Sequence, residues 1–294
     1  MKRHYIISIF TTLVLILFLS SCSDLKKDLP TEESDELQIH VQGWTDTTSA
    51  NFHGKAIQNN NWDMHVCQSC HGADYTGGIS GKSCNICHTA PGGPQNCATC
   101  HGMPPAPALD GSTSYTAHGV GAHQIHFIGN GTYSSHSMLC DACHHMPTSI
   151  YDPAHISADG RAEVILNDPL ANLTSSGITP TPTYDPSSMT CTNTFCHGAW
   201  RLPKVGSPDT TMFTTSIMTG ASYAPRWNGG PVEKSCGSTT TCHTLPPNGH
   251  KPSALTICYT CHGDVMDASG NIKNKAKHIN GKIDLAGGVV LNFR

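Results

Sequence analysis

The segment Cys84-Asn-Ile-Cys87-His88-Thr-Ala-Pro-Gly-Gly-Pro-Gln-Asn-Cys97-Ala-Thr-Cys100-His101 contains one short pattern twice. In each copy two cysteines are separated by two residues, and a histidine follows the second cysteine directly. This spacing is the signature of c-type haem attachment. Two thioether bonds reach the two vinyl groups of one porphyrin, and the histidine is then held on one face of the ring, where it can ligate the iron. The segment therefore predicts two closely spaced haem groups.

The same pattern accounts for 14 of the 15 cysteines in the chain. Five pairs have two-residue spacers, whereas Cys191/Cys196 has four intervening residues and Cys236/Cys242 has five. A longer spacer lengthens the loop between the sulfurs but leaves the Cys-His end intact. The predicted thioether cysteines are Cys67, Cys70, Cys84, Cys87, Cys97, Cys100, Cys140, Cys143, Cys191, Cys196, Cys236, Cys242, Cys258 and Cys261. The predicted proximal iron ligands are His71, His88, His101, His144, His197, His243 and His262. Seven covalently bound haem c groups are expected.

Three other kinds of site also use paired cysteines. A single Cys-x-x-Cys-His sequence could be half of a zinc site or a redox-active thiol pair. An even number of cysteines in an exported chain also suggests a disulfide framework. None of these sites requires a histidine after the second cysteine, whereas all seven pairs have one. The sequence therefore favours haem.

Each iron also needs a ligand on its distal side. Besides His4 and the seven proximal histidines, 11 of the 19 histidines remain for seven irons. His123 and His126 lie three residues apart on one face of a helical turn and could serve two neighbouring haems. The segments that begin at His155 and His278 are similar to each other, which suggests the same role. The predicted distal ligands are His53, His118, His123, His126, His155, His250 and His278, and their pairing with the seven irons is left open.

The composition argues against an ordinary hydrophobic core. Residues 22–294 contain 42 Leu, Ile, Val and Phe among 273 residues, about 15%, below the roughly 20% that accompanies a packed aliphatic core. A net charge of −4 fits neither a charge-expanded disordered chain nor a basic nucleic-acid-binding protein. We expect haem groups to supply the core of an irregular, haem-organised multihaem cytochrome c. The fold should be mostly loops, with short helices that carry some motifs and a few short strands, two of them within 162–166 and 282–291.

The N-terminus is typical of an exported lipoprotein. Lys2 and Arg3 precede a mostly apolar stretch, residues 6–19, which fits a signal peptide and is too short to span a bilayer comfortably. The sequence Leu19-Ser-Ser-Cys22 resembles a bacterial lipobox and implies lipidation of Cys22, and Ser23 favours the outer membrane, at its periplasmic or cell-surface face. The predicted organisation is a signal peptide over 1–21, a lipidated N-terminus and tether over 22–50, a four-haem half over 51–173, a Ser/Thr/Pro-rich linker over 174–188 and a three-haem half over 189–294.

The chain combines two-residue and longer spacers between its paired cysteines, and this combination resembles a known protein family. The sequence Cys191-Thr-Asn-Thr-Phe-Cys196-His197-Gly198, together with the two-residue motifs at Cys67 and Cys84, resembles the CxxxxCH/CxxCH-domain family of multihaem c-type cytochrome lipoproteins. The resemblance covers most of residues 51–294, and the five-residue spacer after Cys236 departs from it. It implies bis-histidine haems in close-packed chains and electron transfer at the outer membrane. The implied partners are other c-type cytochromes or a porin–cytochrome conduit, with an extracellular mineral or metal as acceptor.

We therefore expect a heptahaem electron carrier with no catalytic residues, no nucleic-acid partner and a membrane attachment through its lipid anchor. Two axial histidines leave no open position on an iron, which favours electron transfer over ligand activation. The alternative is a multihaem reductase for nitrite, hydroxylamine or a sulfur oxyanion, which needs one open haem site. The chain contains no Cys-x-x-Cys-Lys motif. A subunit of a polymeric cytochrome filament is a further alternative.

Overall fold

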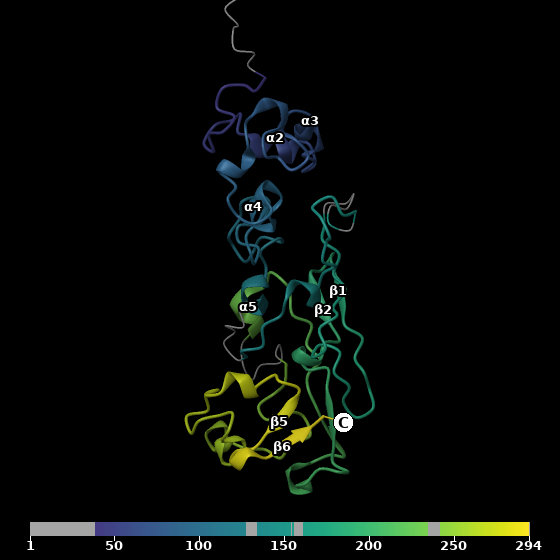
Figure 1. The fold of residues 1–294 in the computed structure, drawn as a ribbon. Coiled ribbons are helices and arrows are strands. Elements are labelled where there is room, and N and C mark those ends of the chain that lie inside the picture. Colours follow the sequence, from purple (N-terminus) through teal and green to yellow (C-terminus); the bar gives the residue numbers. More distant parts are fainter. Residues whose placement is uncertain (1–38, 128–133, 154, 156–160, 235–241, 294) are drawn as a thin grey trace, which may run out of the picture. The chain divides into compact units, whose positions relative to one another are not determined.

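The computed structural model describes residues 39–127, 134–153, 155, 161–234 and 242–293 (Figure 1). The chain divides into two compact units, residues 1–66 and 67–294. The predicted signal peptide, the lipidation site Cys22 and the first cysteine of the sixth motif, Cys236, lie outside the described residues. Among the described helices, none has the length and apolar character needed to cross a membrane.

Short helices carry most of the motifs, as the sequence predicts. The α-helices are α2 (His53–Asn59), α3 (His65–His71), α4 (Cys97–Cys100), α5 (His123–Phe127) and α6 (Tyr259–His262). The 3-10 helices are η1 (Gly78–Ser80), η2 (Cys84–Ile86), η3 (Gly93–Gln95), η4 (Cys140–Ala142), η5 (Phe195–His197), η6 (Thr210–Met212), η7 (Gly230–Lys234), η8 (Leu255–Ile257), η9 (Lys275–Lys277) and η10 (Ala286–Gly288). Six motifs therefore have at least one residue in a helical turn, a conformation that brings the following histidine back beside its cysteines.

The described part of residues 67–294 contains three antiparallel strand pairs. They are β1 (Thr183–Asp185) with β2 (Thr190–Thr192), β3 (Arg201–Pro203) with β4 (Ile217–Thr219), and β5 (Lys282–Asp284) with β6 (Val290–Asn292). The β5–β6 pair, drawn in yellow in Figure 1, confirms the β structure predicted within 282–291. Strand β1 lies inside the segment predicted to be a linker.

The prediction of a strand within 162–166 was wrong. These residues form no strand, and their backbone groups bond to the fourth motif. The amide of Ile165 donates to the carbonyl of Cys143 at 2.9 Å, and the carbonyl of Glu163 accepts from Nδ1 of His144 at 2.8 Å. The alternating pattern in the sequence therefore reflects a segment that lies along a motif.

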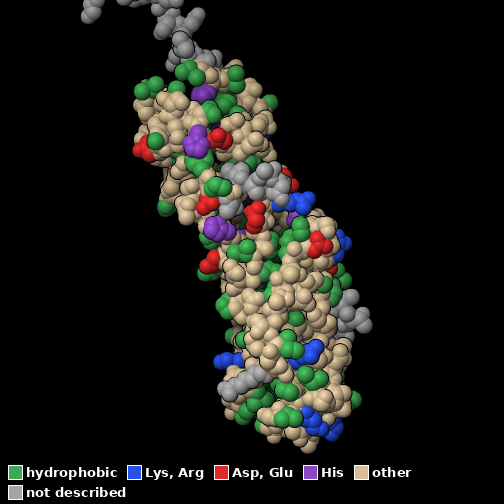
Figure 2. Space-filling view, turned by 90° about the vertical axis from the view of Figure 1, so that its right-hand side faces the viewer, with side chains coloured by type: hydrophobic (Ala, Val, Ile, Leu, Met, Phe, Trp, Pro, Cys, Tyr) green, Lys and Arg blue, Asp and Glu red, His purple; other side chains and the backbone are tan. Residues whose placement is uncertain are grey.

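The buried core of residues 67–294 is small. The described apolar side chains that are buried there are Tyr75, Ala108, Val120, Ala171, Phe195, Phe213, Met218 and Val265. Many larger ones are exposed, and Figure 2 shows hydrophobic side chains spread over the visible face. The polypeptide therefore packs sparsely on itself, as its aliphatic content predicts.

Hydrogen bonds within the second unit join segments on both sides of residues 174–188. The amide of Phe195 donates to the carbonyl of Ala171 at 2.9 Å, and Nε1 of Trp227 donates to the carbonyl of His118 at 3.0 Å. These bonds bring Phe195 of the fifth motif close to Ala171, and Trp227 close to His118. Ala171 and His118 belong to the predicted four-haem half.

Candidate metal centres

The motif cysteines form no disulfide among the described residues, and burial raises the pKa of several of them. Thirteen of the fourteen are described, and none of them forms a disulfide. Burial raises the pKa of Cys143 and Cys191 to about 11 and that of Cys196 to about 12. Redox-active cysteines and zinc ligands act as thiolates and have lowered pKa values. Burial therefore favours the protonated form of these three thiols.

Several motifs lie next to one another. Burial, with a further contribution from the nearby Cys143, raises the pKa of Cys191, so the fourth and fifth motifs are neighbours. A Cβ added to Gly198 would lie 2.0 Å from the carbonyl oxygen of Cys242, so the fifth and sixth motifs are also in contact. Because a Cβ cannot fit there, only glycine allows the two backbones to approach so closely. The fourth, fifth and sixth motifs thus form one cluster.

Three predicted distal histidines each face a predicted proximal histidine. The ring centroids of His123 and His144 are 6.1 Å apart, and those of His126 and His197 are 6.2 Å apart. The rings of His243 and His278 are separated by 6.4 Å. In each pair one member belongs to a motif and the other comes from outside any motif. The structure thus brings three pairs of histidine rings near each other, from a set whose pairing the sequence leaves open.

The separation within these pairs matches two imidazoles on one metal ion. A metal–imidazole bond is about 2.0–2.1 Å long and the nitrogen lies about 1.1 Å from the ring centre, so two axial rings have centroids about 6.3 Å apart. The three observed separations, 6.1, 6.2 and 6.4 Å, all fall close to this value. Rings in van der Waals stacking contact can approach more closely, as His40 and Trp44 do at 4.4 Å. The separations of the three histidine pairs are therefore compatible with one metal ion between the two rings.

Hydrogen bonds fix which nitrogen of these rings can bind a metal. Nδ1 of His123 donates to the carbonyl of Val120 at 3.0 Å, and Nδ1 of His126 donates to the carbonyl of Ala122 at 3.0 Å. The proximal histidines His144 and His243 donate in the same way, to Glu163 and Thr244, each at 2.8 Å. A metal-binding histidine usually gives its second N–H to such an acceptor. Nε2 then carries the lone pair that a metal needs.

Burial keeps the central imidazoles neutral. Desolvation lowers the pKa of His123 to about 4 and that of His197 to about 3, and it also lowers the pKa of His126. All three side chains are half-buried. Because only the neutral imidazole ligates a metal, these shifts favour the binding form at neutral pH.

Six further predicted ligands, proximal and distal, show the same kind of hydrogen bond from Nδ1 to a backbone carbonyl. Nδ1 bonds to a backbone carbonyl in His53 (Trp44, 2.9 Å), His71 (Lys82, 2.8 Å), His101 (Gly102, 3.0 Å), His155 (Ile150, 3.1 Å), His250 (Lys251, 2.7 Å) and His262 (Asp284, 3.3 Å). Burial, with a smaller contribution from the nearby His250, lowers the pKa of His262, which places these two imidazoles near each other. His88 follows η2, and its amide donates to the carbonyl of Cys84 at 3.0 Å.

His118 differs from the other predicted distal ligands. Its Nε2 lies 3.1 Å from the hydroxyl of Tyr184, so the nitrogen that would face an iron is engaged in a side-chain hydrogen bond. His136, which was not predicted as a ligand, is engaged similarly, because its Nε2 lies 3.2 Å from a carboxylate oxygen of the buried Asp168. In this structure neither ring presents a bare Nε2.

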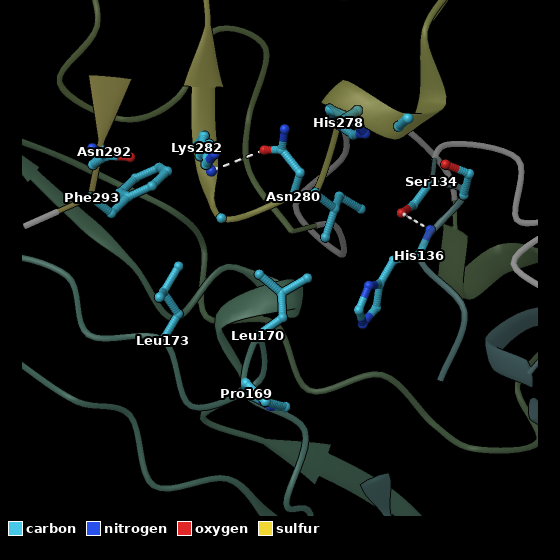
Figure 3. Close-up of a pocket in the computed structure, with 14 residues that line it drawn as sticks. Ser134, His136, Pro169, Leu170, Leu173, His278, Asn280, Lys282, Asn292 and Phe293 are labelled. Carbon is cyan, nitrogen blue, oxygen red and sulfur yellow. Dashed lines mark hydrogen bonds between the residues drawn. The ribbon is translucent and has the colours of Figure 1, made fainter. Parts of the chain in front are cut away.

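A cavity lies beside His278 (Figure 3). Its volume of about 540 Å³ is in the range of roughly 300–1,000 Å³ that cofactor pockets have. Leu170, Leu173 and Phe293 give it apolar walls, while His278 and Lys282 add an imidazole and a cation to its lining. A porphyrin needs this combination of an apolar slot, an iron ligand and a cation for its carboxylates. The lining therefore offers this combination beside His278, and it includes no residue of a Cys-His motif.

Apolar side chains beside the motifs give a second test of fit. Ile86, Leu139 and Ile257 lie within or directly before a motif, and they are 75%, 66% and 51% exposed. Exposed residues of this size are ordinary when scattered, but these three recur at the attachment sequences. A macrocycle bound at each motif would cover them. Among the described residues, no group of three or more His, Cys, Asp or Glu side chains is arranged to hold a metal ion directly, as a zinc site would require.

Two tryptophans were missed by the sequence reasoning. Trp227 packs against both His123 and His126, and Trp200 packs against His243. More than a hundred residues separate Trp227 from His123, so no local pattern could have placed them together. The acceptors of the Nδ1 hydrogen bonds could not be predicted from the sequence either, because they are backbone carbonyls.

Comparison of the chain with protein-family models, with curated proteins and with solved structures finds no match in any of the three.

Proposed function

We propose that the chain is a heptahaem c-type cytochrome that transfers electrons, held at the outer membrane by a lipid on Cys22. The observation that carries this proposal is the set of three imidazole pairs whose separations fit one metal ion between two rings. Each pair joins the histidine of a Cys-His motif to a histidine outside any motif. The seven motifs themselves specify haem as the source of the metal.

The chain's own residues would hold and orient the haems. The motif cysteines attach each macrocycle, the motif histidines bind one axial position, and the Nδ1 bonds to backbone carbonyls set the direction of each imidazole. Haem supplies one-electron chemistry at its iron, and the protein supplies orientation and a dry surrounding.

The clustering of motifs supports transfer between haems. Electron tunnelling falls steeply with distance, so a wire needs neighbouring cofactors. The fourth and fifth motifs are neighbours through Cys143 and Cys191, and the fifth and sixth approach closely at Gly198 and Cys242. The first and second motifs are also close, since Cys67 contributes to the raised pKa of Cys84 after burial. Electrons would pass along these groups toward periplasmic or extracellular partners, which we propose to be other c-type cytochromes, a porin–cytochrome conduit, or an extracellular mineral or metal.

One observation favours a second candidate, a multihaem reductase. The seven predicted distal histidines can serve seven irons only if each of them binds one. In His118, however, Nε2 is hydrogen-bonded to the hydroxyl of Tyr184. If no other histidine replaces His118, one iron keeps an open position where a small oxyanion or hydroxylamine could bind.

Electron paramagnetic resonance of the pure oxidised protein tests the proposal. We expect only low-spin ferric haem, because two imidazoles give a strong axial field. The rings of His126 and His197 are nearly parallel, at 12°, and those of His243 and His278 are steeply crossed, at 71°. Parallel planes split the iron orbitals and give a rhombic signal, whereas crossed planes give a strongly anisotropic one. Both kinds of signal should therefore be present.

A potentiometric titration should accompany the spectra, and every signal should disappear and return reversibly. A high-spin signal equivalent to one haem, which shifts when nitrite or hydroxylamine is added, would favour the reductase. High-spin signals from most of the haems would contradict both the pairing and the wire.

A further inference from the structure

Trp227 contacts two predicted distal ligands at once. Its ring lies 4.7 Å from that of His123 in an edge-on contact at 90°, and 6.0 Å from that of His126 at an interplanar angle of 18°. The two histidines are on the same short helix, α5, but they face the proximal histidines of two different motifs, His144 and His197. A single indole therefore lies against both iron sites.

The indole is held in one orientation. Its Nε1 donates to the carbonyl of His118 at 3.0 Å, and its backbone amide donates to the carbonyl of Met189 at 2.7 Å. Gly121 leaves the space that the ring occupies, because a Cβ at this position would lie 1.9 Å from Nε1. Gly121 also has a φ of +42°, which a residue with a side chain adopts only with strain. The loop before α5 and the indole are therefore fitted to each other.

We propose that Trp227 is a positioning residue that sets the imidazole planes of two neighbouring haem sites together. This inference rests on the proposed function. The plane of an axial imidazole determines the splitting of the iron orbitals and contributes to the potential of the haem. His123 has its Nδ1 bond and a perpendicular ring contact with the indole, and His126 has its own Nδ1 bond and a ring nearly parallel to the indole. A change at Trp227 should therefore alter two haems and leave the others unchanged.

Trp200 provides a matched control. It packs against His243 at 6.3 Å with an interplanar angle of 62°, and it lies 5.4 Å from Phe293. It is thus the same residue type beside a single predicted ligand, in the pair His243/His278. Its replacement should alter one haem, and that haem should differ from the two that respond to Trp227.

The test uses the full, haem-loaded chain with the substitutions Trp227→Leu, Trp227→Phe and Trp200→Leu. Leucine removes the aromatic face, whereas phenylalanine keeps a face and loses only the N–H bond to His118. Haem content by mass spectrometry should be the same in all variants. We expect Trp227→Leu to shift two of the seven low-spin signals and the potentials of the same two haems, Trp227→Phe to restore most of that shift, and Trp200→Leu to move a third signal only.

Unchanged signals and potentials in Trp227→Leu would overturn the inference, as would a spectrum in which all haems change together. If Trp227→Leu does not accumulate with its full haem content, Gly121→Ala is the second variant, because the added Cβ must displace the indole. It should move the same two signals, and a wild-type spectrum from it would count against the inference. A wild-type protein that lacks haem or low-spin signals would instead refute the proposed function.

Discussion

Produced in cells that cannot attach haem, the chain is expected not to fold. Its far-ultraviolet circular dichroism should be that of an unordered chain, and it should be digested rapidly by protease. The reason is the small core of the polypeptide, since residues 22–294 contain only about 15% Leu, Ile, Val and Phe. The short helices and two-stranded pairs that it forms are not stable by themselves.

The expected effect is large because so much apolar surface depends on the cofactor. Ile86, Leu139 and Ile257 are each more than half exposed without it. Covering a side chain of this size stabilises a fold by roughly 1.5–3 kcal/mol, while the whole stability of a domain is about 5–15 kcal/mol. The control is the same chain expressed with a haem-attachment system. A native-like spectrum and protease resistance from haem-free protein would show that the polypeptide has a sufficient core of its own.

The substitution His126→Ala should convert one haem in seven from low-spin to high-spin. His126 and His197 have centroids 6.2 Å apart, and Nδ1 of His126 is occupied by the carbonyl of Ala122. Loss of this imidazole leaves the iron with His197 alone, which opens an axial position. Electron paramagnetic resonance and the visible charge-transfer band measure the high-spin fraction. His126→Met should keep that iron six-coordinate and raise its potential, on the order of 0.1 V, because thioether ligands favour the reduced iron.

His136→Ala is the matched control for His126→Ala. His136 is another histidine near the fourth motif, but its Nε2 is bonded to the carboxylate of Asp168. All haems should therefore stay low-spin in this variant. The pairing would be wrong if His126→Ala remained entirely low-spin, or if His136→Ala produced the high-spin signal instead.

The parts of these sites that are local in sequence could be predicted, and the long-range parts could not. Spacing alone predicts the motif cysteines and histidines as a haem-attachment set, because thioether attachment would constrain residues next to one another. The i, i+3 relation of His123 and His126 predicted that they could serve two haems, and the structure places them against two different motif histidines. By contrast, His197, whose ring lies near that of His126, is 71 residues away from it in the sequence.

The alternating sequence pattern predicted a strand correctly only where the backbone pairs with a second strand. At 282–291 the pattern corresponds to β5 and β6, whereas at 162–166 the same kind of pattern follows a segment whose backbone bonds to the fourth motif. The segment 174–188, rich in Ser, Thr and Pro, still contains β1, because Tyr184 pairs in register with Cys191 of the fifth motif. The contacts that fix the segments 162–166 and 183–185 are thus contacts with motif residues outside these segments, which no pattern within them predicts.

The most direct test of the account is the intact mass of the mature protein purified from a cell that attaches haem. We predict a polypeptide that begins at Cys22 and carries acyl chains and seven haem groups, which uses all fourteen motif cysteines. The mass of the bare polypeptide, or that mass reduced by two hydrogens for each cysteine pair, would show thiols or disulfides in place of haem and would contradict the account.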